Sequence, residues 1–147
     1  MFLDPAQIRA GLQELAAARP GPIAVLGGVA GLLYGTRRLT ADLDVLALSP
    51  LSGFPHGSPL ALHDDSMRGY SSETRAGIPL DVLLPGPALR ALAVEAIKAA
   101  RVAPESPVPV LRAEHWAAFK LMAARGKDED DLKAAIKTGH LDPVVAR

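Results

Sequence analysis

Two adjacent glycines, Gly27 and Gly28, interrupt the longest apolar stretch of the chain, which runs from Ile23 to Tyr34. The residues before them, Ile23 to Leu26, are typical of a short buried strand, and Val29 to Tyr34 predict a short helix. Because a membrane-spanning helix needs about 18–20 apolar residues, this stretch is too short to cross a bilayer. The glycines therefore mark the turn of a buried strand–turn–helix unit, where a bare backbone permits close approach.

Strand and helix patterns alternate along the rest of the chain. Asp4 is a good N-cap and Pro5 suits a first helical turn, so a helix is predicted from there to the break at 20–22. Further strands are predicted at residues 43–48, 61–63 and 78–84, the last within a hairpin across 69–84 that turns at 75–77. Further helices are predicted from residue 87 onward, at 113–124, and from 128 to just before 139, whereas 104–109 reads as a linker.

The length and composition indicate one domain, and the interleaved strand and helix patterns indicate a mixed α/β or α+β class. The chain has 147 residues, 49% of them hydrophobic and 22% charged, which is enough for a real core. We expect residues 1–104 to form the core of this single domain, 1–147, and residues 105–147 to form a short C-terminal helical appendix. No signal-peptide pattern begins the sequence, so we expect a cytoplasmic protein without membrane contact.

Charge and cysteine content exclude several classes of function. Sixteen basic residues balance sixteen acidic residues, which argues against a broadly basic coat for nucleic acid. The chain has no cysteine, so disulfides, thiolate nucleophiles, zinc fingers and iron–sulfur clusters are excluded. Its four histidines are scattered without metal-ligand spacing and are read as ordinary residues.

Carboxylates are the strongest candidates for a functional site. Asp42 and Asp44 stand two residues apart at the start of a predicted strand, so both side chains point to one face. Adjacent carboxylates repel each other, and a divalent cation relieves that cost. Oxygen ligands of this kind suit Mg²⁺ or Mn²⁺. Asp81 lies in another predicted strand, which we expect beside the first, and it supplies a third ligand.

These residues belong to a longer pattern, Gly-Gly-x-Ala followed by Gly-x-x-Arg-x-Thr-x-Asp-x-Asp. The pattern resembles that of the nucleotidyltransferase superfamily, which has the DNA polymerase β-like fold. The matching residues are Gly27, Gly28, Ala30, Gly35, Arg38, Thr40, Asp42 and Asp44. The chain looks most like the small bacterial members related to the AbiE-type, type IV toxin nucleotidyltransferases.

The resemblance implies a mixed β-sheet flanked by helices and an enzyme that moves a nucleotidyl group from a nucleoside triphosphate to a hydroxyl. It implies that Asp42, Asp44 and Asp81 hold Mg²⁺ or Mn²⁺ and that Asp81 also helps deprotonate the acceptor. Nucleotide-binding residues would be Gly27, Gly28, Arg38, Thr40 and Lys120. A second tier comprises Arg37, Lys127, Asp128 and Asp131.

Several alternatives remain open at this stage. Lys120, Asp128 and Asp131 equally fit a salt-bridge network that docks the last helices, and Arg37 and Arg38 equally fit solvated loop cations. The acceptor is either an RNA or tRNA end, in a toxin-like role with a cognate antitoxin-type protein, or a small molecule such as an antibiotic. A third alternative is a catalytically degenerate fold that senses nucleotide or binds a partner protein.

Overall fold

A computed structural model describes residues 2–35, 39–60, 66–104 and 106–123 of the chain. The helices are α1 (Pro5–Ala18), α2 (Gly27–Leu33), α3 (Arg90–Ala99) and α4 (Ala113–Ala123), with a 3₁₀ turn, η1 (Pro87–Leu89), leading into α3. The strands are β1 (Ile23–Leu26), β2 (Leu43–Ala47), β3 (Met67–Glu73), β4 (Pro79–Pro85), β5 (Arg101–Ala103) and β6 (Ser106–Val110). They form one sheet in the order β3-β4-β2-β1-β6-β5.

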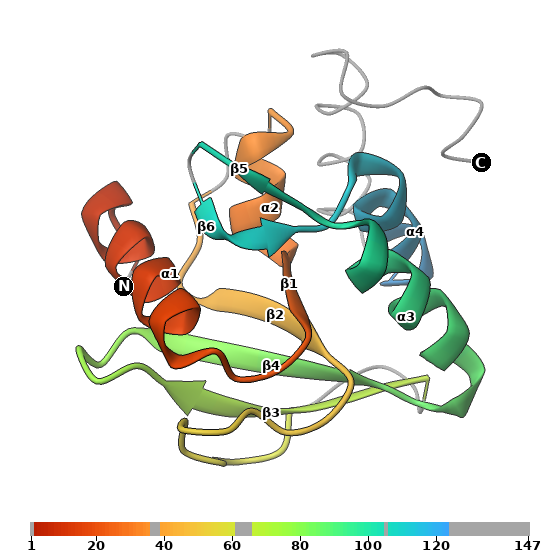
Figure 1. Cartoon of the computed structure of the whole chain (residues 1–147), viewed down its shortest axis with the longest axis horizontal. Coiled ribbons are helices and arrows are strands. Elements are labelled where there is room, and N and C mark those ends of the chain that lie inside the picture. Colours follow the sequence, from red (N-terminus) through yellow and green to blue (C-terminus); the bar gives the residue numbers. More distant parts are fainter. Residues whose placement is uncertain (1, 36–38, 61–65, 105, 124–147) are drawn as a thin grey trace.

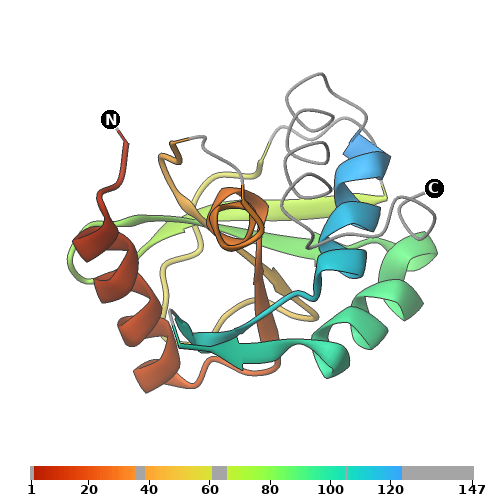
Figure 2. The same ribbon diagram turned by 90° about the horizontal axis from the view of Figure 1, so that it is seen from above.

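The sheet is mixed, as the sequence predicts. β2 runs parallel to β4 and β1 runs parallel to β6, while the other neighbouring pairs are antiparallel. Figures 1 and 2 show α1 on one side of the molecule and α3 and α4 on the other. The interleaving of strands and helices confirms the expected fold class.

Local sequence signals account for the first helix. The Asp4 side chain accepts a hydrogen bond from the Gln7 amide at 2.8 Å, and the Gln7 side chain accepts one from the Asp4 amide at 2.9 Å. This reciprocal pair is a capping box, which satisfies backbone donors that the helix itself cannot use. Leu12 and Leu15 are buried on the inner side of α1, as their spacing predicts.

The core lies between the helices and the sheet. All four residues of β1 are buried, which agrees with the continuous apolar run in the sequence. Trp116 of α4 is only 1% exposed and Ala117 beside it is fully buried, so α4 packs onto the same core. Among the described residues, no helix is both long and apolar enough to cross a bilayer.

The prediction of a linker at 104–109 is wrong, because β5 and β6 form a hairpin there and β6 lies beside β1. Pro107 and Pro109 lack backbone N–H groups and so argue against a strand. They occupy alternate positions, however, and leave Ser106, Val108 and Val110 to supply the buried face. The Ser106 hydroxyl also bonds both backbone groups of Val108, accepting from its N–H at 3.2 Å and donating to its carbonyl at 2.7 Å. The predicted strand at 61–63 and the helix from 128 lie outside the described residues.

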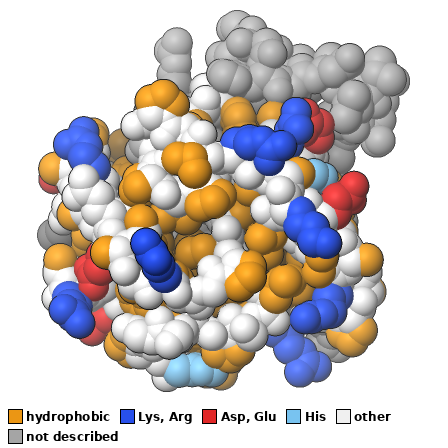
Figure 3. All heavy atoms as spheres, viewed as in Figure 1, with side chains coloured by type: hydrophobic (Ala, Val, Ile, Leu, Met, Phe, Trp, Pro, Cys, Tyr) orange, Lys and Arg blue, Asp and Glu red, His pale blue; other side chains and the backbone are white. Residues whose placement is uncertain are grey.

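One face of the molecule carries hydrophobic side chains over its middle, with lysines and arginines toward its edges (Figure 3). An apolar groove of about 700 Å³ lies between α1, α2 and the β5–β6 hairpin, and Leu12, Leu32 and Val102 are among its lining residues. None of the three candidate aspartates lines this groove. It is therefore separate from the site that the sequence singles out.

Candidate metal centre

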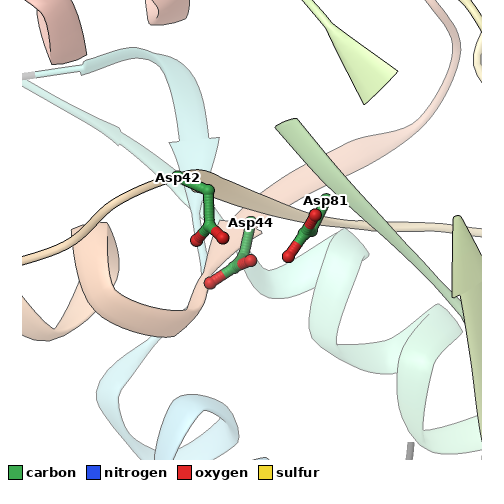
Figure 4. Close-up of side chains that lie close together, drawn as sticks. All are labelled: Asp42, Asp44 and Asp81. Atoms are coloured by element: carbon green, nitrogen blue, oxygen red, sulfur yellow. The ribbon is translucent and has the colours of Figure 1, made fainter. Parts of the chain in front are cut away.

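Three carboxylates converge at one place on the sheet. Asp42 stands directly before β2, Asp44 lies within β2, and Asp81 lies within β4 (Figure 4). One oxygen from each of the three side chains can be chosen so that all lie within 4.8 Å of one another. Asp81 thus lies beside the pair, as the sequence predicts.

Strand register explains this convergence. β2 and β4 are parallel neighbours, and Asp44 is the register partner of Asp81. Because side chains alternate between the faces of a strand, Asp42 and Asp44 share a face, while Leu43 and Val45 turn into the core. The fully buried Leu80 and Val82 hold β4 in place on either side of Asp81. Burial of these hydrophobic neighbours therefore fixes the register that brings the acids together.

The crowded acids perturb one another. All three are half-buried. The pKa of Asp81 is raised from its ordinary 3.8 to about 6, first by burial and then by the charge of Asp42 and a side-chain hydrogen bond with Asp42. That hydrogen bond favours the protonated form of Asp81, which donates to the Asp42 carboxylate. A cation placed among the three oxygens would replace the proton and remove the repulsion.

The donor set fits a hard divalent cation. All three ligands are carboxylate oxygens, which Mg²⁺ and Mn²⁺ prefer over the nitrogen and sulfur ligands that favour zinc. Mg²⁺ usually takes one or two protein carboxylates and completes its shell with water and substrate phosphates. Half-burial leaves the site open to such ligands, so the three aspartates could hold a metal of this type.

The glycine turn packs directly against the site. Gly27 has φ +67, a left-handed conformation that side chains disfavour, and a Cβ atom there would lie 2.0 Å from Oδ2 of Asp44. A Cβ atom at Gly28 would lie 2.7 Å from Oγ1 of Thr40. The sequence suggested these glycines for approach to a phosphate. The structure adds a second reason, because any larger residue would displace Asp44 or Thr40.

Thr40 supports the loop that enters β2. Its side chain is buried, and its hydroxyl donates a 2.9 Å hydrogen bond to the carbonyl of Asp42. Its own carbonyl accepts a 2.8 Å hydrogen bond from the amide of Leu3. These contacts hold the backbone of Asp42 in place, and a direct contact of Thr40 with nucleotide stays a prediction.

Two aromatic residues beside the turn were not predicted as part of the site. The Trp116 indole Nε1 donates to the carbonyl of Gly27 at 3.3 Å, and the Tyr34 hydroxyl donates to the carbonyl of Leu111. Burial and the charge of Glu114 raise the pKa of Tyr34, so its hydroxyl stays protonated as a donor. Trp116 is itself buried in the core. The only sequence signal for its contact with the glycine turn was that a buried indole needs a hydrogen-bond acceptor.

The other predicted residues have no described side-chain position. Arg37, Arg38, Lys127, Asp128 and Asp131 lie outside the described residues. The backbone of Lys120 belongs to α4, one turn beyond Trp116, but its side chain is outside what the structure describes. Their functional roles therefore stay predictions.

Comparison with known proteins supports the fold. No protein-family model and no curated protein matches the chain. The crystal structure of a putative nucleotidyltransferase from H. pylori matches with a TM-score of 0.57, at 18% sequence identity, over 95% of this chain and 70% of that one. A second putative nucleotidyltransferase, from Thermotoga maritima, matches with a TM-score of 0.51, at 13% identity, over 88% of this chain and 90% of that one. The chain thus shares the fold of these proteins, as its sequence pattern predicts.

Proposed function

We propose that the chain is a metal-dependent nucleotidyltransferase that moves a nucleoside monophosphate from a nucleoside triphosphate to an acceptor hydroxyl. The observation that carries the proposal is the convergence of Asp42, Asp44 and Asp81, whose oxygens lie within 4.8 Å of one another. The shared fold with the two solved structures supports it. After burial, the cause that raises the pKa of Asp81 is the neighbouring carboxylate of Asp42, as expected of acids that share one cation.

Each aspartate has a proposed role. We propose a site for two Mg²⁺ or Mn²⁺ ions. Asp42 and Asp44 would hold the ions, and Asp81 would also hold the second of them. Ions bound there would offset the charge that develops on the phosphate oxygens. The acceptor oxygen attacks the α-phosphorus, a new P–O bond forms, and pyrophosphate leaves as the bond to the β-phosphate breaks. Asp81 helps to accept the proton that the acceptor hydroxyl loses.

The glycine turn is proposed to hold the outer phosphates. Without side chains, the backbone at Gly27 and Gly28 permits a phosphate to approach closely. Gly27 also lies against Asp44, which brings the turn close to the candidate metal ligands. Arg38 and Lys120 are proposed to add positive charge, with Arg37 and Lys127 as second-tier candidates.

Two classes of acceptor fit the proposal. An RNA or tRNA end would give a toxin-like role, with an antitoxin-type protein as partner. A small hydroxyl compound, such as an antibiotic, is favoured by the net charge of zero, because long nucleic acids are bound mainly through many cationic contacts to phosphate. Transfer from labelled triphosphate to each acceptor class would separate the two. A degenerate, non-catalytic fold is the remaining alternative, and the complete set of three aspartates argues against it.

Thermal unfolding with each of the four nucleoside triphosphates, with and without Mg²⁺, tests the nucleotide site without a known acceptor. A ligand at about 100 times its Kd stabilises the folded state by about 2.7 kcal/mol. We expect a Mg²⁺-dependent rise in Tm for the wild type and none for Asp44→Ala. Glu73→Ala is the matched control, since Glu73 is an exposed acid on β3 outside the three-aspartate site. No rise with any triphosphate, or a rise that Asp44→Ala retains, would contradict the proposal.

A further inference from the structure

A set of hydrogen bonds joins the segment that leads into α4 to the strand–turn–helix unit beside the three aspartates. The amide of Leu111 donates to the carbonyl of Val25 at 3.0 Å, and the Leu111 carbonyl accepts from the Tyr34 hydroxyl. The Trp116 indole donates to the Gly27 carbonyl at 3.3 Å. We call Tyr34, Leu111 and Trp116 the brace, because they connect β1, the glycine turn and the end of α2 to one neighbouring segment.

Trp116 is the member of the brace that reaches the turn itself. Its side chain is 1% exposed, and its ring lies 5.6 Å from that of Tyr34, at an interplanar angle of 47°. A buried indole N–H without an acceptor is costly, so the bond to Gly27 is strongly favoured over an unpaired state. The position of the Gly27 carbonyl is therefore tied to the packing of α4.

The turn that Trp116 holds is in contact with a metal-ligand candidate. A Cβ atom on Gly27 would fall 2.0 Å from Oδ2 of Asp44, so the bare backbone of the turn lies directly against that carboxylate. The indole hydrogen bond restrains the carbonyl of the same residue, Gly27. We propose that Trp116 is a positioning residue, which holds the Gly27–Gly28 turn against Asp44 and so restricts the orientation of that carboxylate. The part of this inference that concerns nucleotide rests on the proposed function, and the part that concerns the turn and the cation does not.

A purely structural role for Trp116 predicts different behaviour. If Trp116 only fills the core, a replacement of equal volume leaves the Asp44 carboxylate and its cation affinity unchanged. If it positions the turn, loss of the N–H alone lets the turn move, and Asp44 gains freedom that cation binding must remove again. Removal of the donor without removal of the ring therefore separates the two roles.

The sequence allows this replacement at Trp116 alone. Trp116 is its only tryptophan, so a tryptophan-auxotrophic host would exchange this residue alone for β-(3-benzothienyl)alanine, which has sulfur in place of the indole N–H. Two quantities would be measured: Mn²⁺ affinity, by electron paramagnetic resonance of free Mn²⁺, and the backbone order parameter of Gly28 without metal, by ¹⁵N relaxation. Binding of the triphosphate that stabilises the wild type would be a third readout.

We expect the substituted protein to bind Mn²⁺ roughly three- to tenfold more weakly, since a neutral hydrogen bond is worth about 0.5–1.5 kcal/mol. We expect the order parameter of Gly28 to fall below the value of about 0.85 that is typical of rigid backbone, with Tm lowered by only a few degrees. Trp116→Phe should act in the same direction. Phe119→Leu is the control. Phe119, like Trp116, is an aromatic residue of α4 that packs on the core, but it is only partly buried and carries no N–H.

An unchanged order parameter of Gly28, or unchanged Mn²⁺ affinity in the substituted protein, would overturn the inference. Equal weakening by Phe119→Leu would also overturn it, because general loosening of α4 would then suffice. Failure of the proposed function has a different signature. In that case the wild type would bind Mn²⁺ but no triphosphate, and Asp44→Ala would not bind Mn²⁺. The effect of the Trp116 replacement on Mn²⁺ affinity and on Gly28 would still decide the role of Trp116.

Discussion

Gly27 and Gly77 are two of the five glycines with a positive φ among the described residues, and they differ in what surrounds them. Gly27 follows β1 with φ +67, and Gly77 precedes β4 with φ +80. A Cβ atom at Gly77 would meet no atom within 4 Å, whereas one at Gly27 would collide with the Asp44 carboxylate. The backbone need for glycine is the same at both turns. Only Gly27 also serves a neighbouring side chain, which distinguishes a turn at a site from a turn that merely reverses the chain.

The turn at Gly77 is explained by local bonding. The amide of Gly77 donates to the carbonyl of Thr74 at 2.9 Å, and the amide of Ile78 donates to the Thr74 hydroxyl at 3.1 Å. The amide of Arg75 donates to the Glu14 carboxylate at 2.6 Å, which ties the hairpin to α1. These contacts close the β3–β4 hairpin and thereby support the strand that carries Asp81.

Gly27→Ala should have the largest effect. The left-handed backbone costs about 1–2 kcal/mol with a side chain present, and forcing a methyl group against Asp44 adds about 1–3 kcal/mol. We expect urea unfolding to show a loss of roughly 2–5 kcal/mol, and calorimetry to show Mn²⁺ binding weakened by more than tenfold. Wild-type cation affinity in this variant would mean that the turn does not control Asp44.

A double-mutant cycle between Gly27→Ala and Asp44→Ala should sharpen the comparison. Because the alanine at 27 collides with the Asp44 side chain, removal of that side chain should recover about 1–2 kcal/mol of the loss. The same cycle with Gly77→Ala should be additive, since a Cβ atom at Gly77 would meet no atom within 4 Å. Equal coupling energies at the two glycines, measured by urea unfolding, would remove the distinction drawn here.

The pH dependence of stability should reflect the three-aspartate site. The pKa of Asp81 is raised from 3.8 to about 6, so between these values the folded protein keeps a proton that the unfolded chain has lost. The free energy of unfolding of the metal-free protein should therefore fall as pH rises from about 4 to 7. After allowance for solvent screening, we expect a fall of about 1 kcal/mol.

Mn²⁺ displaces this proton, so its affinity should rise with pH up to about 6 and then level off. Asp81→Asn should remove the part of the fall in unfolding free energy that comes from Asp81, because asparagine does not titrate. Gly77→Ala should follow the wild-type profile, because a Cβ atom at Gly77 would meet no atom within 4 Å and so would not disturb Asp81. A wild-type stability that rises over the same pH range would contradict the raised pKa of Asp81.

Gly77→Ala should have the smallest effect. It carries the cost of the left-handed backbone without a collision, so we expect a loss of about 1 kcal/mol and a Tm lowered by a few degrees. Mn²⁺ affinity should match that of the wild type within experimental error. A large loss of cation binding would show that the β3–β4 hairpin controls the position of Asp81 more strongly than its register suggests.

The sequence alone determined the elements whose signals are local. The Asp4 capping box, the β3–β4 hairpin and the strand–turn–helix unit at Gly27 follow from residue spacing and turn chemistry, which act over a few residues. The shared face of Asp42 and Asp44 follows from the two-residue period of a strand. The fold class and the three-aspartate site could therefore be predicted, Asp81 on the further expectation that its strand lies beside that of Asp44.

Only the tertiary structure decided the contacts between distant segments. It set the parallel register that makes Asp44 the partner of Asp81, and it inserted β6 beside β1, where the prolines had indicated a linker. It also brought the indole of Trp116 to the carbonyl of Gly27, 89 residues away in the chain. Such pairings depend on which hydrophobic faces are buried together after the chain closes, and no local pattern at position 27 or 116 specifies its partner.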